Sequence, residues 1–398
     1  MSHTSENLQL LITSDSEGYF QYLPYFFIKG DLHRLPYAIG LPNGNTLNLY
    51  HIGVAILQAP FFLLAHLYAL LFNIEPTGFT RPYLLSIFVA AASYLSIACY
   101  MLTVVISKNF GRLVAIISVS LILLATNLLY YSSHEAGMSH VYSFFLFTLF
   151  ISNLDKCLKN LSAKRSIYLG LTLGLIAIVR PSNLIVGICI PMWGVSSIKE
   201  FKERLAFLIS KPLSLLLFGL SLGVALLPQL LYWKLVTGDF FVFSYGQVGQ
   251  GFNWGSPELL NVLFSPQNGW LIYSPIMLFS LVGLAITSKN MTFNSYAILP
   301  IILITYYIFS SWWAWWFGAA YGHRAFIDYY PFLLFPLAFV IQRLLDMPSL
   351  TIKYLMGSLF IFFIYLNIRM TFLYNPPWDG PDWGWSDYLI IIKQVFFI

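Results

Sequence analysis

Two carboxylates and two tyrosines stand close together near the start of the chain. Asp15 and Glu17 are separated by one residue and are followed by Tyr19 and Tyr22. Acids are scarce in the rest of the sequence, because Asp and Glu together number 16 in 398 residues. A carboxylate in an aromatic setting is suited to act as a general base that removes a proton from a hydroxyl group. The alternative interpretation is a solvated turn beside a membrane.

A second polar cluster lies between two apolar segments. Here His134 and Glu135 follow two tyrosines, and His140 stands five residues after Glu135. An ionisable side chain at a membrane boundary is costly unless it is solvated or paired, so such residues are functional candidates. The alternative is a polar helix end that is bathed in water.

Two arginines are placed where they can hold an anion. Arg180 ends an apolar run and is followed by Pro181, while Arg324 follows His323 in a glycine-flanked turn. A guanidinium in such a turn is well suited to bind a phosphate group. For Arg180 the alternative is an interfacial side chain that extends to lipid headgroups. The tryptophans before Arg324, in 312–316, are also typical of an aromatic belt at a membrane interface.

The long loop 234–269 is rich in Gly, Gln, Asn and aromatic residues, with Trp254 near its middle. Aromatic rings cover the apolar face of a sugar, and neutral amides pair with its hydroxyl groups. An ordinary surface loop has the same composition. The glycines match neither a dinucleotide-binding pattern nor a P-loop.

Composition decides which elements must position these residues. Hydrophobic residues make up 58% of the chain and charged residues only 9%, which is far from the composition of soluble domains. The net charge of +5 does not predict a nucleic-acid partner, because the basic residues lie in short loops between apolar runs. The three cysteines have neither metal-binding nor disulfide spacing and are expected to be packing residues. The sequence therefore predicts a multi-pass membrane protein.

The apolar segments predict an all-α transmembrane bundle of about 10 crossing helices, with further interfacial helices in the first outward loop. They cover Ile52–Phe72, Tyr83–Ile106, Leu113–Tyr131, Ser139–Leu154, Ile167–Val179, Leu184–Val195, Leu213–Trp233, Trp270–Thr287, Phe293–Ser310, Phe326–Leu345 and Leu355–Tyr374. Basic residues concentrate in alternate loops, which the positive-inside rule places in the cytoplasm. The polar loops that contain Glu135, Arg180, Trp254 and Arg324 then face outward.

The first apolar segment, Ile52–Phe72, decides on which side Asp15 lies. If the segment crosses the membrane, Asp15 is cytoplasmic; if it lies in the interface, Asp15 faces outward with the other polar loops. Gln58, Pro60 and His66 interrupt its apolar character, which favours the interfacial alternative. The expected organisation is one membrane domain, in which 1–82 form a first outward loop, 83–374 the transmembrane helices and 375–398 an outward-facing tail.

Together these stretches resemble the polytopic glycosyltransferases of the GT-C fold, in the family 39-like branch of protein O-mannosyltransferases and aminoarabinose transferases. The resemblance extends over nearly the whole chain in short motifs: the Asp15 loop, Ala59-Pro60-Phe61, Lys108–Arg112, Tyr130 to Glu135, Val179-Arg180-Pro181, Tyr273-Ser274-Pro275 and Tyr321–Arg324. The chain departs from the pattern in having only Leu8–Ile12 before the catalytic loop, no large soluble C-terminal domain, and Gln58-Ala59-Pro60 in place of a basic-residue-proline-proline motif.

The resemblance implies transfer of a sugar from a polyprenyl-phosphate donor to an acceptor hydroxyl on a protein, lipid or glycan. Asp15 is then the general base, with Glu17 as the alternative, and the departing phosphate is bound by Arg324, with His323 and Arg180 as helpers. The other candidates for substrate binding are Tyr19, Tyr22, Glu135, His140, Trp254 and Tyr273. Glu135, His134 and His140 either bind a divalent cation (Mg, Mn or Zn) or orient the base.

Two other functions remain open on the sequence alone. A transporter or flippase would show inverted repeats and mid-membrane charges, whereas no repeat is found and the ionisable residues cluster at helix ends. A polymerase or ligase of lipid-linked polysaccharide would share the outward arginines but would not need the Asp15 loop. The expected location is a bacterial inner membrane, with the active site facing the periplasm or exterior.

Overall fold

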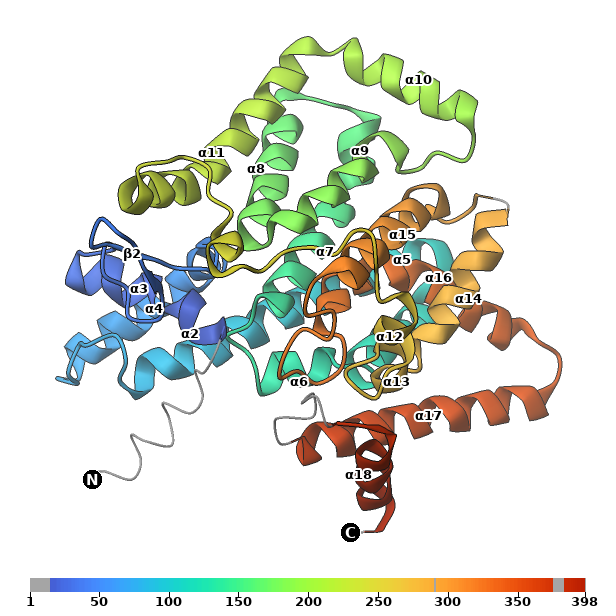
Figure 1. The fold of residues 1–398 in the computed structure, drawn as a ribbon. Helices are drawn as coiled ribbons and strands as arrows, with labels where there is room; N and C mark the ends of the chain where they lie inside the picture. Colours follow the sequence, from blue (N-terminus) through green and yellow to red (C-terminus); the bar gives the residue numbers. More distant parts are fainter. Residues whose placement is uncertain (1–14, 290, 375–382, 398) are drawn as a thin grey trace. The chain divides into compact units, whose positions relative to one another are not determined.

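The computed structural model describes residues 15–289, 291–374 and 383–397 (Figure 1). Leu8–Ile12 and most of the Trp/Pro-rich part of the predicted tail, 375–382, lie outside these residues. The described chain is mostly helical, as predicted. Strands β1 (Ile39–Gly40) and β2 (Thr46–Leu47) form one short antiparallel pair.

The chain folds as two compact units, each built from three separate stretches of sequence. The first unit comprises Met1–Ile97, Tyr131–Leu184 and Lys211–Gln250, and the second comprises Ala98–Tyr130, Ile185–Ser210 and Gly251–Ile398. The expected organisation as one membrane domain with a first outward loop stays a prediction. The division assigns Asp15, Glu135 and Arg180 to one unit, and Trp254 and Arg324 to the other.

In the first unit the chain begins with short helices and continues with long ones. These are α2 (Asp15–Phe20), α3 (Tyr22–Pro24), the π-helix η1 (Tyr25–Lys29), α4 (Gly53–Leu71), α7 (Ser139–Lys159), α8 (Ala163–Val179), α11 (Pro212–Thr237) and the 3-10 helix η3 (Ser244–Val248). Helices α5 (Arg81–Leu124) and α6 (Leu128–Ser133) and the 3-10 helix η2 (Pro181–Ile188) contain a unit boundary.

The second unit combines short helices with apolar ones. They are α9 (Cys189–Met192), α10 (Ile198–Ile209), α12 (Leu259–Phe264), α13 (Trp270–Tyr273), α14 (Met277–Lys289), α15 (Ser295–Ser311), the 3-10 helix η4 (Arg324–Tyr329), α16 (Tyr330–Asp346), α17 (Leu350–Leu373) and α18 (Trp385–Phe397).

Among the described residues, six helical segments are long and apolar enough to cross a membrane: Gly53–Leu71, Arg81–Leu124, Ser139–Lys159, Pro212–Thr237, Arg324–Asp346 and Leu350–Leu373. The larger predicted number of crossings is not confirmed. Some predicted segments are broken: the chain at 270–287 forms the short helix α13 and then α14, interrupted near Pro275. The segment at 184–195 forms 3-10 helix and a single α-turn.

The sequence predicts helix breaks at two places, and the structure shows only one of them. The long helix α5 has one non-helical residue, Gly111, with φ 78° and ψ 164°, so two helices meet within the predicted loop that joins them. Pro60, in contrast, lies inside a continuous α4. Because Gly53–Leu71 has the length and composition of a membrane span, the interfacial position of this helix stays a prediction.

The first unit is held together by a close seam between α8 and α11, which run side by side (Figure 1). A Cβ at Gly174 would stand 2.5 Å from the Cβ of Ala225, and a Cβ at Gly170 would overlap the main chain of Phe218. Small residues let two helix backbones approach within van der Waals contact, which is how helices associate in an apolar solvent.

In the second unit, a buried polar centre joins several helices around Asn127, which has no exposed surface. Its side chain accepts a hydrogen bond of 2.7 Å from the Tyr330 hydroxyl and donates one of 3.2 Å to the carbonyl of Tyr321. The indole N–H of Trp270 donates to the same Tyr330 hydroxyl at 3.3 Å, and its ring stacks on that of Phe326 with centroids 4.0 Å apart. A buried amide that is paired in this way fixes the register of the segments that it joins.

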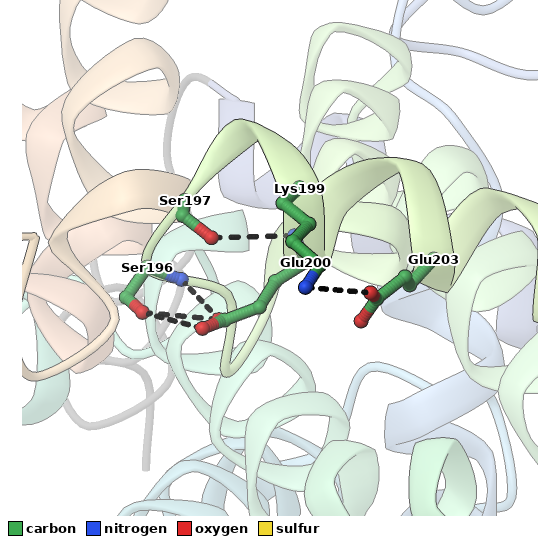
Figure 2. A network of polar contacts seen from close by, with 5 residues as sticks. All are labelled: Ser196, Ser197, Lys199, Glu200 and Glu203. Carbon is green, nitrogen blue, oxygen red and sulfur yellow. Dashed lines mark hydrogen bonds and ion pairs between the residues drawn. The ribbon is translucent and has the colours of Figure 1, made fainter.

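Helix α10 lies between the predicted apolar segments Leu184–Val195 and Leu213–Trp233, and its first turn is capped (Figure 2). The Ser197 hydroxyl accepts from the main-chain N–H of Glu200 at 3.2 Å, and the Glu200 carboxylate accepts from that of Ser196 at 2.8 Å. This reciprocal arrangement resembles a capping box. Lys199 and Glu203 add an exposed ion pair one turn apart, at 4.0 Å.

Candidate functional site

The candidate site lies in the first unit, where the N-termini of α4 and α7 meet the C-terminus of α8. Gly53, at the start of α4, lies against the main chain of Ile178 and Val179 at the end of α8. Gly137, just before α7, lies against Ser16 of α2, and a Cβ there would be 2.7 Å from the Cβ of Ser16. These two contacts bring Asp15 to the same end of the unit as the polar residues near Glu135 and Arg180.

The carboxylate of Asp15 accepts a hydrogen bond from the hydroxyl of Tyr50, with 2.8 Å between Tyr50 Oη and Asp15 Oδ1. Burial raises the pKa of Tyr50, and the charge of Asp15 raises it further. The phenol therefore stays protonated at neutral pH and acts as the donor. A hydrogen bond of this kind stabilises the ionised form of the carboxylate that accepts it.

Tyr50 stands in a group of tyrosine rings that comes from three parts of the first unit. Tyr19 and Tyr245 meet it edge to face, with ring centroids 5.2 and 6.3 Å away, and Tyr37 stacks on it at 6.0 Å. Burial of this kind removes water from one side of the Asp15 contact and strengthens the hydrogen bond.

Main-chain contacts fix Tyr50 as well. The side chain of Asn48 accepts from the N–H of Tyr50 at 3.0 Å and donates to the carbonyl of Gly18 at 2.7 Å. The hydroxyl of Tyr22 donates to the carbonyl of Tyr50 at 2.7 Å. Tyr22 is only 1% exposed, so the residue that we predicted to bind substrate has a structural position beneath the site.

The basic residues of the site are Arg180, His140 and His51. Arg180 Nη1 lies 3.5 Å from His140 Nδ1, and the ring of Tyr131 meets the ring of His140 at 5.2 Å. Burial lowers the pKa of His51 to about 4, with a further contribution from the charge of Arg180. His51 is therefore neutral at physiological pH, and Arg180 supplies the positive charge.

The other acidic and basic candidates of this unit are less deeply set. Burial raises the pKa of Glu17, and Glu135 is half-buried while His134 is exposed. Among the described residues, no three His, Cys, Asp or Glu side chains come together as a metal site. A cation site at Glu135, His134 and His140 stays a prediction: His140 lies on the buried first turn of α7, and His134 lies on the exposed loop before it.

The remaining candidates lie in the second unit. His323 is 1% exposed and packs against the rings of Phe309, Phe317 and Phe326, and Arg324 is half-buried at the start of η4. Tyr273 is buried, and its hydroxyl donates to the carbonyl of Pro266 at 2.7 Å. His323 and Tyr273 are therefore interior, whereas Arg324 is only partly covered.

Trp254 is the exposed aromatic candidate of the second unit, with 49% of its surface accessible. Its ring stacks with that of Phe252, at 4.6 Å, and with that of Tyr307, at 5.9 Å. Main-chain hydrogen bonds from Asn253 to Ser311 and from Glu258 to Ser310 hold this loop against the end of α15. A contact of Trp254 with a sugar ring stays a prediction.

Sequence reasoning missed Tyr50 and His51. They directly precede α4, at the end of a polar stretch that contains Asn48. A tyrosine and a histidine next to each other at the start of an apolar segment were a usable signal, but nothing in the spacing connects residue 50 with residue 15.

No protein-family model matches this chain, and no curated protein sequence matches it. Among solved structures, it is similar to the archaeal oligosaccharyltransferase AglB from Archaeoglobus fulgidus in complex with an inhibitory peptide and a dolichol-phosphate, at 13% identity and a TM-score of 0.50. The match covers 97% of this chain and 52% of AglB, so the chain spans about half the length of that protein. A second Archaeoglobus fulgidus oligosaccharyltransferase structure, with zinc and sulfate, matches at 13% identity and a TM-score of 0.45, over 96% of this chain and 49% of that one.

The similarity to AglB shows the fold. The chain shares the fold of AglB, which is the GT-C fold. The narrower resemblance to family 39-like mannosyltransferases is not confirmed.

Proposed function

We propose that the protein is a membrane glycosyltransferase that transfers a sugar from a lipid-linked phosphate donor to an acceptor hydroxyl. The observation that carries the proposal is the Asp15–Tyr50 hydrogen bond in the same unit as Arg180, within a GT-C fold. AglB was solved with a dolichol-phosphate and an inhibitory peptide, which supports a lipid-linked donor and a separate acceptor for this chain also.

In the proposed reaction, Asp15 takes the proton from the acceptor hydroxyl as its oxygen attacks the anomeric carbon of the donor. The bond between that carbon and the phosphate oxygen breaks, and the phosphate leaves with the electron pair as polyprenyl phosphate. A new bond joins the sugar to the acceptor oxygen, with inversion at the anomeric carbon. The residue that takes the proton must be ionised beforehand, which is the state that the Tyr50 hydroxyl favours in Asp15.

Negative charge develops on the departing phosphate, and a fixed cation lowers the energy of that transition state. In the first unit Arg180 is suited to this role, with His140 beside it and Tyr19 and Glu135 available to the sugar or the acceptor. In the second unit, Arg324 is a separate candidate for the donor phosphate, and His323 supports it from the interior. Trp254 is our candidate for contact with a sugar ring.

Transfer of label from radiolabelled polyprenyl-phosphate sugars tests the proposal, in membranes that contain wild type, Asp15→Asn or Glu17→Gln at matched protein levels. Asp15→Asn should lower transfer by about 100-fold or more, which is the usual contribution of a general base, and Glu17→Gln should retain most of it. In the same assay, Arg324→Ala tests whether Arg324 of the second unit binds the donor phosphate.

Each contrary result has a definite meaning. If Asp15→Asn transfers label as well as wild type, Asp15 is not the general base, but the proposed glycosyl transfer is not contradicted. If wild type consumes no donor but moves a labelled lipid between the leaflets of a proteoliposome, the protein is a flippase and the proposal is wrong.

A further inference from the structure

The contact between Tyr50 and Asp15 has a direction and a fixed geometry. A carboxylate can only accept a hydrogen bond, so the Tyr50 hydroxyl is the donor at 2.8 Å. The ring cannot easily swing away, because it is enclosed by Tyr19, Tyr37 and Tyr245 and lies against Gly18. The hydroxyl is thus held at one place beside the carboxylate.

The same contact distinguishes the two acids of the motif. Asp15 and Glu17 are two residues apart in α2, and residues at this spacing point to different sides of a helical turn. Tyr50 bonds to Asp15. For Glu17 the prevailing influence is burial, which disfavours its charged form.

We propose that Tyr50 is a positioning residue that orients Asp15 and keeps it ionised, and so makes Asp15 rather than Glu17 the general base. This inference rests on the function proposed above. Tyr50 itself does not touch the reacting atoms: it acts through the carboxylate, and the surrounding tyrosines and Asn48 act by holding Tyr50.

Tyr50→Phe is the direct test, because it keeps the ring and removes only the donor. A hydrogen bond to a charged group is worth enough for kcat to fall by about 10- to 100-fold. The KM for the polyprenyl-phosphate sugar should stay within about twofold, because this substrate does not contact Tyr50 in the proposal. The acidic limb of the pH–rate profile should move to higher pH, because the pKa of Asp15 rises when the carboxylate loses its hydrogen bond from the Tyr50 hydroxyl.

Tyr94→Phe is the matched control. The Tyr94 hydroxyl lies in the same unit and donates to the carbonyl of Leu57 at 2.8 Å, so its loss removes a comparable hydrogen bond away from Asp15. This variant should keep the wild-type pH profile.

A second variant covers the case in which Tyr50→Phe does not accumulate. Site-specific incorporation of 3-fluorotyrosine at position 50 keeps the ring and the hydroxyl and makes the phenol a stronger donor. The acidic limb should then move to lower pH, whereas a purely structural tyrosine predicts no movement.

The outcomes separate this inference from the proposed function. If Asp15→Asn abolishes transfer while both Tyr50 variants keep the wild-type kcat and pH profile, the positioning role is wrong and the function stands. A rise in KM alone would make Tyr50 a substrate-binding residue and would also overturn the inference. If Asp15→Asn transfers normally, the assignment of the base fails first.

Discussion

The ring of Tyr50 lies directly on the α-carbon of Gly18, so closely that a Cβ at residue 18 would overlap the ring carbons. The missing side chain of Gly18 makes the space in which Tyr50 reaches Asp15, one turn earlier in α2. The position of Asp15 relative to Tyr50 thus depends on Gly18. The Tyr50 hydroxyl donates to the Asp15 carboxylate, and Gly18 leaves the space that the Tyr50 ring occupies.

Gly18→Ala should displace the Tyr50 ring and weaken its hydrogen bond to Asp15. Forcing a methyl group into a packed position costs about 1–3 kcal/mol, and we expect transfer to fall by at least about tenfold along with the melting temperature in detergent. Gly40→Ala is the control, because nothing lies within 4 Å of a Cβ there. Equal behaviour of the two variants would mean that Gly18 is not needed to place Tyr50.

The seam between α8 and α11 predicts opposite signs for two glycine substitutions. Gly174→Ala should destabilise the first unit by about 1–3 kcal/mol, because the new Cβ meets Ala225 at 2.5 Å. Gly219→Ala, in α11, has nothing within 4 Å of its Cβ and should stabilise the helix by about 0.5–1 kcal/mol. Thermal unfolding in detergent compares the two, and a stabilising Gly174→Ala would contradict the packing described here.

His51 predicts a dependence of stability on pH. Its pKa is about 4 in the folded protein and about 6.5 in the unfolded chain, so the unfolded chain binds the proton more readily. The contribution of neutral His51 to the free energy of unfolding is complete above about pH 6.5. It is lost as the pH falls toward about 4, by at most about 3 kcal/mol.

The measurement for His51 is the melting temperature of wild type and of His51→Gln at pH 7.5, 5.5 and 4.5. As the pH falls, the melting temperature of wild type should decrease relative to that of His51→Gln. A constant gap would show that His51 titrates normally in the folded protein.

Arg180→Ala should lower kcat by about 100-fold if its charge stabilises the departing phosphate. Arg180→Lys should recover only part of this loss, since an ammonium lacks the planar donor geometry of a guanidinium. Arg165→Ala is the control, because the Arg165 guanidinium is exposed and donates to the carbonyl of Asn160. Wild-type kcat in Arg180→Ala would assign Arg180 to the membrane interface, the alternative that its sequence position left open.

The sequence by itself determined the class of the protein and much of its helical pattern. Apolar runs and scarce charges identify a helical membrane protein because the bilayer imposes the same length on every span. The break at Gly111 was also readable, since a glycine between basic residues at the end of a long apolar run marks a turn. Local chemistry singled out Asp15, Arg180 and Arg324 for the same reason: ionisable groups are costly in such a chain.

Only the tertiary structure decided which of these residues belong together. It brings Asp15 into contact with Tyr50 and Arg180 beside His140 in the first unit, and it places Arg324, His323 and Trp254 in the second. It also turns Tyr22 and Tyr273 inward. Periodicity and composition report on neighbours along the chain, whereas these contacts depend on how helix ends meet across glycines such as Gly18, Gly53 and Gly137. That packing is specified by side-chain shape over the whole unit, which no short motif carries.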